Sequence, residues 1–493
     1  MAELGGRRAL AIDLGAESGR AVVGAFKGDR LAIDEVHRFA NRPVRLASAL
    51  HWDILALYAG VVEGIDAALA AGSLASLGID GWGVDFGLLD EAGELLGIPV
   101  HYRDPRTDGL MEAVDALVPR AELYRRTGIQ AMQMNTLYQL VALRRSRQAI
   151  LPSARHLLLV PDLITYWLTG VRGAEWTNAT TTGCIDATMR AWATDLLERL
   201  DLPVRIFPEI VEAGTVVGPL RIPGRDDDHG SAVAVVASAS HDTASAVVAV
   251  PLEGFGDAYV SSGTWSLVGV EVPTPVITAE AEALNVTNEG GVGGTYRLLR
   301  NVMGLWLVQG LRESLVRHGF AYTYDELVQA AERAGPARAW IDPDDPALLH
   351  PADMAEAVRA ACWTSGQPVP SEPGEFVRVV LESLALRYRW VIEGLERLTR
   401  RRIRTLHVVG GGARNALLCQ LAADATGRTV IAGPAEATAI GNILVQLLAT
   451  GSIGSISEAR ELVSRSFARR RFEPGEGGSW ADAYAHFAAT PRW

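Results

Sequence analysis

Cysteine is scarce in this 493-residue sequence, and no apolar run of membrane-spanning length lacks a charge or a proline. The three cysteines, Cys184, Cys362 and Cys419, lie far apart and are odd in number, which argues against a disulfide framework or a cysteine-rich metal site. The chain also begins without a hydrophobic leader, so no signal peptide is indicated. We therefore expect a cytoplasmic protein with no membrane partner.

An excess of positive charge is also missing. The chain carries 46 Lys and Arg against 58 Asp and Glu, which gives a net charge of −12. This balance disfavours a nucleic acid as partner, because such binding needs clustered positive charge. A phosphate ligand stays possible, since it needs only local donors. A basic run, Arg400–Arg402, fits the C-terminus of a helix, where cations suit the helix dipole.

What the chain does contain is a large apolar fraction, 48%, and its most informative stretch is 231–250, SAVAVVASASHDTASAVVAV. Ala232–Ala237 predicts a buried strand and Ala244–Val250 predicts a helix. His241-Asp242-Thr243 interrupts them. Asp242 or Thr243 could cap the helix, or Asp242 could be a reactive carboxylate at the floor of a cleft, because a buried charge is costly unless it is paired or used. The stretch alone leaves both interpretations open.

Two parts of the chain share a pattern of strand, small-residue turn and strand. The first runs IDLGAESGRAVVGAF from Ile12, and the second runs VSSGTWSLVGVEV from Val260. Aligning Gly15 with Gly263 matches an apolar strand, a polar residue, a glycine, a hydroxyl and a second strand. This predicts an internal duplication with a boundary near 254–256.

Apolar periodicity and turn residues place further elements along the chain. In the first half we expect a helix from about 53 to 71, a mostly helical region over 106–167 and a polar loop over 177–182. In the second half we expect helices over 303–318, 324–334, 352–365, 375–399, 413–427 and 437–451, and strands over 405–409 and 429–432.

Three small-residue turns are candidates for binding phosphate. In Asp13-x-Gly15-x-x-Ser18-x-Arg20, backbone N–H groups can cradle a polyphosphate, with Arg20 facing phosphate and Asp13 holding water around Mg²⁺. An ordinary hairpin turn is the alternative. Ser261–Thr264 would be its counterpart, or simply a hydroxyl-rich turn. Gly410–Gly412 lets a ring or a phosphate approach the backbone, and because it is not G-x-G-x-x-G, a dehydrogenase is disfavoured.

Two aromatic-polar clusters are candidates for contacting a polyol. Trp82–Phe86 places an aromatic beside the carboxylate of Asp85, although a half-buried strand with Asp85 pointing outward explains it equally well. His101–Asp104 has the same two interpretations. Asn301 and Gln309 are eight residues apart, on or near one helix, and would therefore lie on similar faces, where solvated surface amides are the default.

In this order the motifs resemble those of the actin-like sugar kinases of the FGGY carbohydrate kinase family. The resemblance extends over nearly the whole chain. The blocks that carry it are IDLGAESGR (12–20), GIDGWGVDFGLLD (78–90), VHYRDPRT (100–107), MNTLYQL (134–140), TNATTT (177–182), HDTASAV (241–247), SSGTWSL (261–267), NVTNEGG (285–291), NVMGLWLVQ (301–309), VGGGARN (409–415) and EATAIGN (436–442).

The resemblance implies an α/β fold of two actin-like (ribonuclease H-like) domains, related by duplication and flanking a deep cleft. Residues 1–253 would mainly bind the sugar and residues 254–493 mainly ATP. Asp242 would be the catalytic residue, which accepts the proton of the sugar hydroxyl. The sugar pocket would be lined by Gly83, His241, Asp242 and Thr243, and ATP would be bound by Ala16, Glu17, Ser18, Gly19, Arg20, Thr264, Asn301, Gln309 and Gly411.

Glu17 departs from the family pattern, in which a small or hydroxyl residue often stands at this position. An acid beside the phosphates would repel them unless it points outward or helps to hold Mg²⁺.

The implied activity is phosphorylation of a sugar, with ATP and Mg²⁺ as cofactors. L-Rhamnulose is the favoured substrate, and another ketose or polyol such as L-fuculose is the alternative. An inactive regulator that binds sugar or ATP is disfavoured, because no basic recognition segment is evident. The expected partner is therefore a small-molecule sugar, without nucleic acid, and the protein would be a monomer or a small homo-oligomer.

Overall fold

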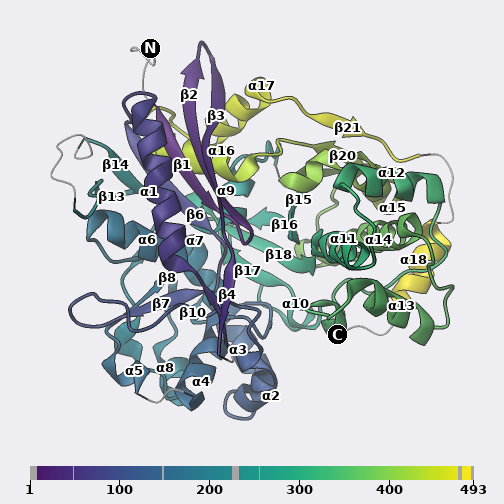
Figure 1. Ribbon diagram of the computed structural model, residues 1–493, viewed down its shortest axis with the longest axis horizontal. Coiled ribbons are helices and arrows are strands. Elements are labelled where there is room, and N and C mark those ends of the chain that lie inside the picture. Colours follow the sequence, from purple (N-terminus) through teal and green to yellow (C-terminus); the bar gives the residue numbers. More distant parts are fainter. Residues whose placement is uncertain are drawn as a thin grey trace. The chain divides into compact units, whose positions relative to one another are not determined.

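The computed structural model describes residues 8–47, 49–146, 149–224, 232–254, 256–475 and 480–489 (Figure 1). No helix within these ranges is long and apolar enough to cross a membrane. The chain forms two compact units, each built from separate segments. Unit 1 comprises Met1–Pro251, Glu271–Leu298 and Ala437–Phe467, and unit 2 comprises Leu252–Val270, Leu299–Glu436 and Ala468–Trp493.

Unit 1 is built on a six-stranded sheet in the order β13-β14-β6-β1-β2-β3. Its central strand β1 is buried at every residue, because Ala, Leu and Ile fill it as far as Asp13. β1 pairs antiparallel with β2 and parallel with β6, and β6 pairs parallel with β14. The strands are β1 (Ala9–Leu14), β2 (Ser18–Lys27), β3 (Arg30–Ala40), β6 (Ser76–Gly81), β13 (Thr215–Pro219) and β14 (Ala234–Ala237).

The strands of unit 2 repeat this arrangement. β15 pairs antiparallel with β16 and parallel with β19, β19 pairs parallel with β20, and β20 pairs antiparallel with β21. In unit 1, β1, β2, β6, β14 and β13 pair in the same way. The shared order supports the predicted duplication. The strands that repeat the pairing are β15 (Asp257–Ser262), β16 (Trp265–Val272), β19 (Thr405–Val409), β20 (Thr429–Ala432) and β21 (Arg470–Phe472), within a seven-stranded sheet that also contains β17 (Thr287–Gly290) and β18 (Tyr296–Met303).

Helices and short strands complete the units. The remaining elements are β4 (Pro43–Leu46), β5 (Ala49–Trp52), α1 (Ile54–Ala70), β7 (Phe86–Leu89), α2 (Leu110–Asp115), α3 (Arg120–Thr127), α4 (Thr136–Ser146), α5 (Ile150–Ser153), β8 (His156–Leu159), α6 (Val160–Thr169), β9 (Ala174–Glu175), α7 (Trp176–Ala179), β10 (Ile185–Asp186), β11 (Ala191–Trp192), α8 (Thr194–Arg199), β12 (Ile210–Val211), α9 (Asp242–Val248), α10 (Ala279–Ala283), α11 (Trp306–Arg317), α12 (Tyr324–Ala334), α13 (Met354–Thr364), α14 (Pro373–Thr399), α15 (Ala416–Thr426), α16 (Ala437–Ala449), α17 (Ile456–Ser466) and α18 (Trp480–Ala489).

Several predicted elements have the expected ends, and one segment has a different structure. The strands β19 and β20 and the helix α12 have the predicted bounds. The loop expected over 177–182 is instead helical, because α7 continues into a short 3₁₀ helix, Thr180–Thr182. Each of these three threonine hydroxyls donates to the carbonyl three residues before it, so the polar side chains support the turn.

The compact units do not coincide with the predicted halves 1–253 and 254–493, since α16 belongs to unit 1. Buried amides fasten this helix to the sheet. Gln446 donates to the carbonyl of Leu10 at 2.9 Å and accepts from the hydroxyl of Ser76 at 2.7 Å, while Asn442 donates to Asp80 at 2.5 Å. The periodicity of apolar residues along the sequence does not predict such long-range polar contacts. Phe255, within the expected boundary, and Ser231 lie outside the described residues.

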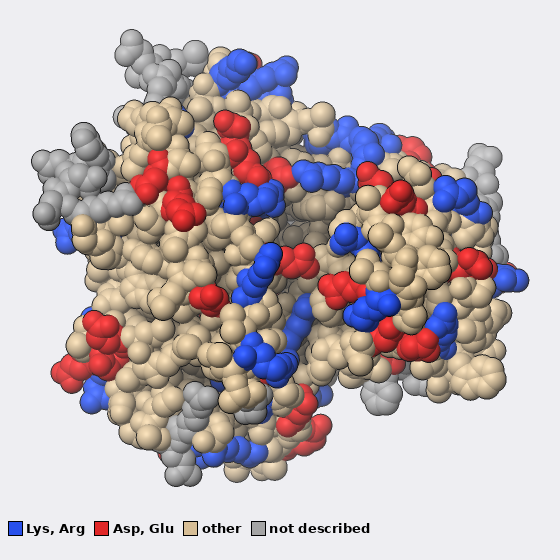
Figure 2. Space-filling model, viewed as in Figure 1, with Lys and Arg blue, Asp and Glu red and all other residues tan. Residues whose placement is uncertain are grey.

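Charged side chains of both signs are interspersed over the face shown in Figure 2. Many of them form local pairs. Arg126, for example, lies 2.7 Å from both Asp186 and Asp195.

Gly441 should be indispensable for the packing of α16 on α9. A Cβ atom at this position would overlap the carbonyl group of Ser245, which is backbone and cannot rotate away. We expect Gly441→Ala to lower the free energy of unfolding by about 2 kcal/mol or more, as overpacking does, measured by urea denaturation. Gly218→Ala is the matched control, because its nearest neighbour would be an ordinary contact at 3.9 Å. Equal stability of the two variants would contradict the prediction.

Candidate active site

The candidate site starts at the carboxyl ends of the parallel strands of unit 1. Asp13 and Asp80 are register partners near the ends of β1 and β6. The N–H of Gly81, at the end of β6, donates to the carbonyl of Ser240 at 2.9 Å. α/β proteins bind ligands at this edge of the sheet. The pairing brings Asp242 close enough to Asp13 and Asp80 for their charges to interact.

Asp242 is the first residue of α9, and its neighbours orient its carboxylate. The hydroxyl of Thr243 donates to Oδ1 at 3.2 Å, and Nε2 of His241 lies 3.5 Å from the same oxygen. The Asp242 side chain is 33% exposed, so a ligand can reach it. His241 occupies the cap position of α9 and makes no capping bond with its side chain. The interpretation that Asp242 or Thr243 caps this helix is therefore wrong.

The surroundings of Asp242 disfavour its charged form. Burial raises the pKa of its carboxyl group, His241 lowers that pKa, and the charge of Asp13 raises it again. Burial, followed by Asp13, also raises the pKa of Asp80 well above its ordinary value. The three carboxylates therefore repel one another, and a nearby cation would relieve that repulsion.

The β1–β2 hairpin presents the predicted phosphate loop. The N–H of Gly15 donates to the carbonyl of Ser18 at 3.0 Å, and the side-chain amide of Asn41 donates to the carbonyl of Gly15 at 2.9 Å. Ala16 and Glu17 stand at the tip of this braced turn. The side chain of Glu17 is exposed, which is the outward orientation that an acid beside phosphates requires.

Gly19 and Arg20, at the start of β2, make packing and ion-pair contacts within the sheet. A Cβ atom at Gly19 would overlap the ring of Phe39, so the glycine lets β2 approach that side chain. Arg20 forms an ion pair with Asp13 across the hairpin. Its guanidinium therefore already has an anionic partner, and a contact of Arg20 with phosphate stays a prediction.

A buried carboxylate, Glu175, fixes the backbone that leads to Asp242. Glu175 is 1% exposed, and its Oε2 accepts from both the N–H and the hydroxyl of Ser240 at 2.9 Å. It also accepts from the hydroxyl of Thr177 at 2.5 Å, and that hydroxyl oxygen accepts from the N–H of His241 at 3.3 Å. Sequence reasoning missed Glu175, because a carboxylate that serves mainly backbone groups forms no recognisable motif.

Asp85 is enclosed by hydrogen-bond donors. It is 0% exposed, and its Oδ2 accepts from the indole N–H of Trp52 at 2.6 Å, from that of Trp82 at 3.1 Å and from the N–H of Tyr102 at 3.1 Å. Its Oδ1 accepts from Gln139 at 2.9 Å. Burial raises the pKa of Asp85 to about 6, and the bond from Trp52 is the largest effect that opposes the rise. Neither sequence interpretation, a sugar contact or an outward-facing carboxylate, holds for Asp85.

His101 belongs to the same aromatic cluster. Its ring stacks on Trp52 with 4.0 Å between the centroids, and the residue is buried. Burial lowers the pKa of His101 to about 3, so the ring is neutral. The predicted polyol contacts at 101–104 are thus at least partly core residues.

At Gly83 the backbone packs closely against the side chain of Thr181. A Cβ atom there would lie 2.7 Å from the hydroxyl oxygen of Thr181. The next residue, Val84, has a positive φ of 67°, and its N–H donates to the same hydroxyl at 3.1 Å. The 3₁₀ turn that contains Thr181 therefore fixes the Gly83 loop, and the preceding α7 fixes His241 through Thr177.

In unit 2, the segment that contains Thr264 lies next to the glycine-rich turn at Gly410–Gly412. The turn after β15 is fastened by the N–H groups of Gly304 and Trp306, both of which donate to the carbonyl of Thr264 at 3.1 Å. A Cβ atom at Gly410, where φ is 79°, would lie 2.9 Å from the carbonyl oxygen of Ser262. At Gly411 no atom would lie within 4 Å of a Cβ, so this glycine borders open space.

Asn301 and Gln309 lie on different elements, so the expectation that they lie on similar faces at one helix is wrong. Asn301 lies on β18, whereas Gln309 lies on α11, which begins at Trp306 rather than 303. The apolar run of 302–308 continues from the strand into the helix, so periodicity alone does not show the break at Gly304.

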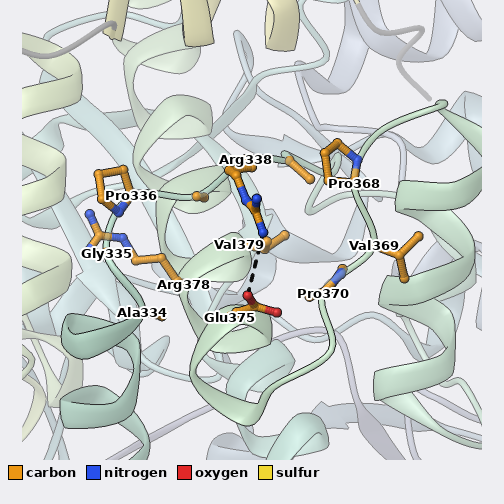
Figure 3. Close-up of a pocket in the computed structure, with 12 residues that line it drawn as sticks. Ala334, Gly335, Pro336, Arg338, Pro368, Val369, Pro370, Glu375, Arg378 and Val379 are labelled. Atoms are coloured by element: carbon orange, nitrogen blue, oxygen red, sulfur yellow. Dashed lines mark ion pairs between the residues drawn. The ribbon is translucent and has the colours of Figure 1, made fainter.

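A separate pocket of unit 2 contains none of the predicted site residues. It lies between the end of α12 and the start of α14, and Pro368–Pro370 form part of its lining (Figure 3). Arg338 and Glu375 form an ion pair at 3.9 Å across it.

The described carboxylates of unit 1 could supply one ligand to Mg²⁺ but not a complete set of protein ligands. Within the described ranges no group of three His, Cys, Asp or Glu residues could hold a metal ion. Mg²⁺, however, usually takes one or two carboxylates together with water and substrate phosphates. Asp13 suits this role, because its charge repels Asp80 and Asp242 and a cation would offset that repulsion.

Replacing Asp85 by its amide should destabilise the protein. In either orientation the new NH₂ group of Asp85→Asn would face an N–H donor, which leaves buried donors unsatisfied. We expect the free energy of unfolding to fall by about 1–3 kcal/mol, measured by urea denaturation. The control Asp201→Asn alters a carboxylate that is 76% exposed and should change little. An unaltered midpoint for Asp85→Asn would contradict this account of the cluster.

Comparison with known proteins gives consistent matches along the chain. The N-terminal domain of the FGGY family of carbohydrate kinases matches residues 8–249, and its C-terminal domain matches residues 258–450. The chain is 45% identical over 478 residues to a rhamnulokinase of Bacteroides thetaiotaomicron, with 97% of this chain and 98% of that protein covered. It is 41% identical over 484 residues to a rhamnulokinase of Pectobacterium carotovorum, with 97% and 96% covered.

Solved structures agree in fold. A gluconate kinase from Lactobacillus acidophilus superposes with a TM-score of 0.79 at 17% identity, over 98% of this chain and 96% of that chain. A glycerol kinase from Plasmodium falciparum with ADP gives 0.77 at 16% identity, over 98% and 97%. With both family domains matched in order and near full-length relatives above 40% identity, the chain belongs to the FGGY family of carbohydrate kinases.

Proposed function

We propose that this protein transfers the terminal phosphate of ATP to the 1-hydroxyl of L-rhamnulose. The family supplies the reaction class, and the relatives named rhamnulokinase support the choice of sugar. The observation that carries the proposal is Asp242, a carboxylate that its neighbours orient and that is still 33% exposed. It stands at the edge of the sheet where ligands of α/β proteins bind.

Asp242 acts as the proton acceptor in this proposal. Phosphoryl transfer passes through a loose transition state, so the protein mainly positions the reacting groups and neutralises charge. Both Thr243 and His241 contact Oδ1, which leaves Oδ2 to accept a hydrogen bond from the sugar hydroxyl. The carboxylate thereby orients the hydroxyl oxygen toward the phosphorus and takes its proton as the new O–P bond forms. Gly83 and His241 would line the sugar pocket.

ATP would be bound by backbone groups of two hairpin turns and one glycine-rich turn. Ala16–Arg20 and Thr264 would contact the phosphates, and Gly411 borders the open space that a nucleotide needs. Asn301 and Gln309 complete the proposed set. Asp13 would hold Mg²⁺, which supplies positive charge to the phosphate oxygens.

Removing the charge of Asp242 should abolish turnover without loss of the fold. Asp242→Asn keeps the shape of the side chain but cannot accept the proton, so we expect kcat for L-rhamnulose to fall by about 10²-fold or more. ATP affinity and the thermal unfolding midpoint should stay near wild type. Asp201→Asn, at an exposed position, is the activity control. Wild-type turnover by Asp242→Asn would exclude Asp242 as the base.

Activity should also depend on the ionisation of Asp242. Because the pKa of this group is raised and the base acts in its ionised form, kcat/KM for the sugar should decline on acidification. The decline should begin above the ordinary pKa of aspartate, about 3.9. The measurement is a pH profile at saturating ATP, with circular dichroism to verify that the fold persists. A flat profile down to about pH 4 would contradict the assignment.

A panel of sugars decides the substrate. With ATP and Mg²⁺ present, L-rhamnulose should be phosphorylated with the highest kcat/KM among L-rhamnulose, L-fuculose, xylulose and glycerol. Turnover of another sugar only would replace L-rhamnulose as the substrate. No turnover with any sugar, despite binding of ATP, would favour the alternative of an inactive regulator.

A further inference from the structure

A buried ion pair lies against the imidazole of His241, on the side away from Asp242. Nδ1 of His241 is 3.1 Å from Nη2 of Arg297 and 3.3 Å from Oε2 of Glu289. The same Nη2 is 3.1 Å from Oε2 of Glu289. On the other edge of the ring, Nε2 is 3.5 Å from Oδ1 of Asp242. Four charged or ionisable side chains thus form a continuous chain that ends at the proposed base.

The ion pair is enclosed and fixed to the backbone. Arg297 is 0% exposed and Glu289 is 4% exposed. Nε of Arg297 donates to the carbonyl of Gly290 at 2.8 Å. The N–H of Gly290 in turn donates to the hydroxyl of Thr180 at 2.8 Å, in the turn that also holds the Gly83 loop. The guanidinium therefore has little freedom to rotate.

The geometry selects one form of the imidazole. A guanidinium can donate hydrogen bonds but cannot accept them. The 3.1 Å bond between Nη2 of Arg297 and Nδ1 of His241 therefore makes Nδ1 an acceptor, and the proton of the neutral ring lies on Nε2. Nε2–H then faces Oδ1 of Asp242 as donor to acceptor. At 3.5 Å this contact is long, and such contacts commonly tighten when substrate binds.

We propose that Glu289 and Arg297 are positioning residues, which hold His241 with its Nε2–H toward Asp242 and thereby leave Oδ2 of Asp242 for the sugar hydroxyl. Glu289 balances the charge of Arg297 and keeps its Nη2 beside the ring, and Arg297 fixes the tautomer. The inference rests on the proposed function, since it assigns the role of proton acceptor to Asp242. Neither residue touches the reacting atoms, so both act through His241.

Glu382 provides a matched control for Glu289. Glu382 is also 4% exposed and accepts from the half-buried Arg378 at 2.6 Å. It lies on α14 of unit 2, and its other bonds go to Ala337 and Trp340, outside the proposed site. If neutralising any buried carboxylate lowered activity or stability, Glu382→Gln would therefore show the same loss.

The test compares steady-state kinetics of full-length variants with ATP and L-rhamnulose. The wild type and Asp242→Asn come first: turnover by the wild type and its loss in Asp242→Asn establish the proposed function independently. Glu289→Gln should then lower kcat by about 10- to 100-fold, as a misplaced base does, while KM for ATP stays unchanged. Glu382→Gln should keep the wild-type kcat per folded molecule.

A double-mutant cycle with His241 separates positioning from structural support. In a His241→Gln background, Glu289→Gln should add less than a twofold loss, because the residue through which it acts is gone. An undiminished second loss, or a wild-type kcat for Glu289→Gln alone, would overturn the proposal.

The tautomer of His241 gives a test that does not depend on the folding of any Glu289 variant. The ¹⁵N chemical shifts of the wild-type protein, with His241 assigned by comparison with His241→Gln, should show Nε2 protonated and Nδ1 unprotonated. Protonation on Nδ1 alone would contradict the arrangement.

Discussion

The candidate chemistry depends on the parallel pairing of β1 with β6 and of β6 with β14. Parallel strands end at the same edge of a sheet, so the pairing brings Asp13, Asp80 and the segment before Asp242 together although they are far apart in the chain. The cost is burial of the carboxyl groups, together with repulsion among them, and both effects raise the pKa of Asp80 and of Asp242. The Mg²⁺ that we propose at Asp13 would offset part of this repulsion.

Buried polar groups around that edge fix its geometry. Glu175 binds the backbone of Ser240, Asp85 binds two indoles and a backbone N–H, and Arg297 binds the ring of His241. Each group is nearly or fully excluded from water, so breaking one of its bonds leaves a partner unsatisfied. Buried contacts therefore fix the loops of the site, while the carboxylate of Asp242 stays accessible, at 33% exposure.

Much of the architecture was predictable because it follows local patterns. The strands β19 and β20 and the helix α12 have the predicted ends, and the repeated strand-turn-strand motif corresponds to two sheets with the same pairing. The errors occur where side chains override local pattern. Threonines 180–182 close a helical turn through their own hydroxyls, and the break at Gly304 separates Asn301 on a strand from Gln309 on a helix.

The sequence by itself determined the family, the order of the phosphate-type turns and the identity of Asp242 as the candidate base, because these depend on short motifs in a fixed order. Only the tertiary structure decided that Asp85 and His101 are enclosed, that Asp242 does not cap α9, and that α16 belongs to unit 1. It alone revealed Glu175, Glu289 and Arg297. Their roles arise from contacts between residues that are distant in sequence, and no local pattern of apolar and polar residues records such contacts.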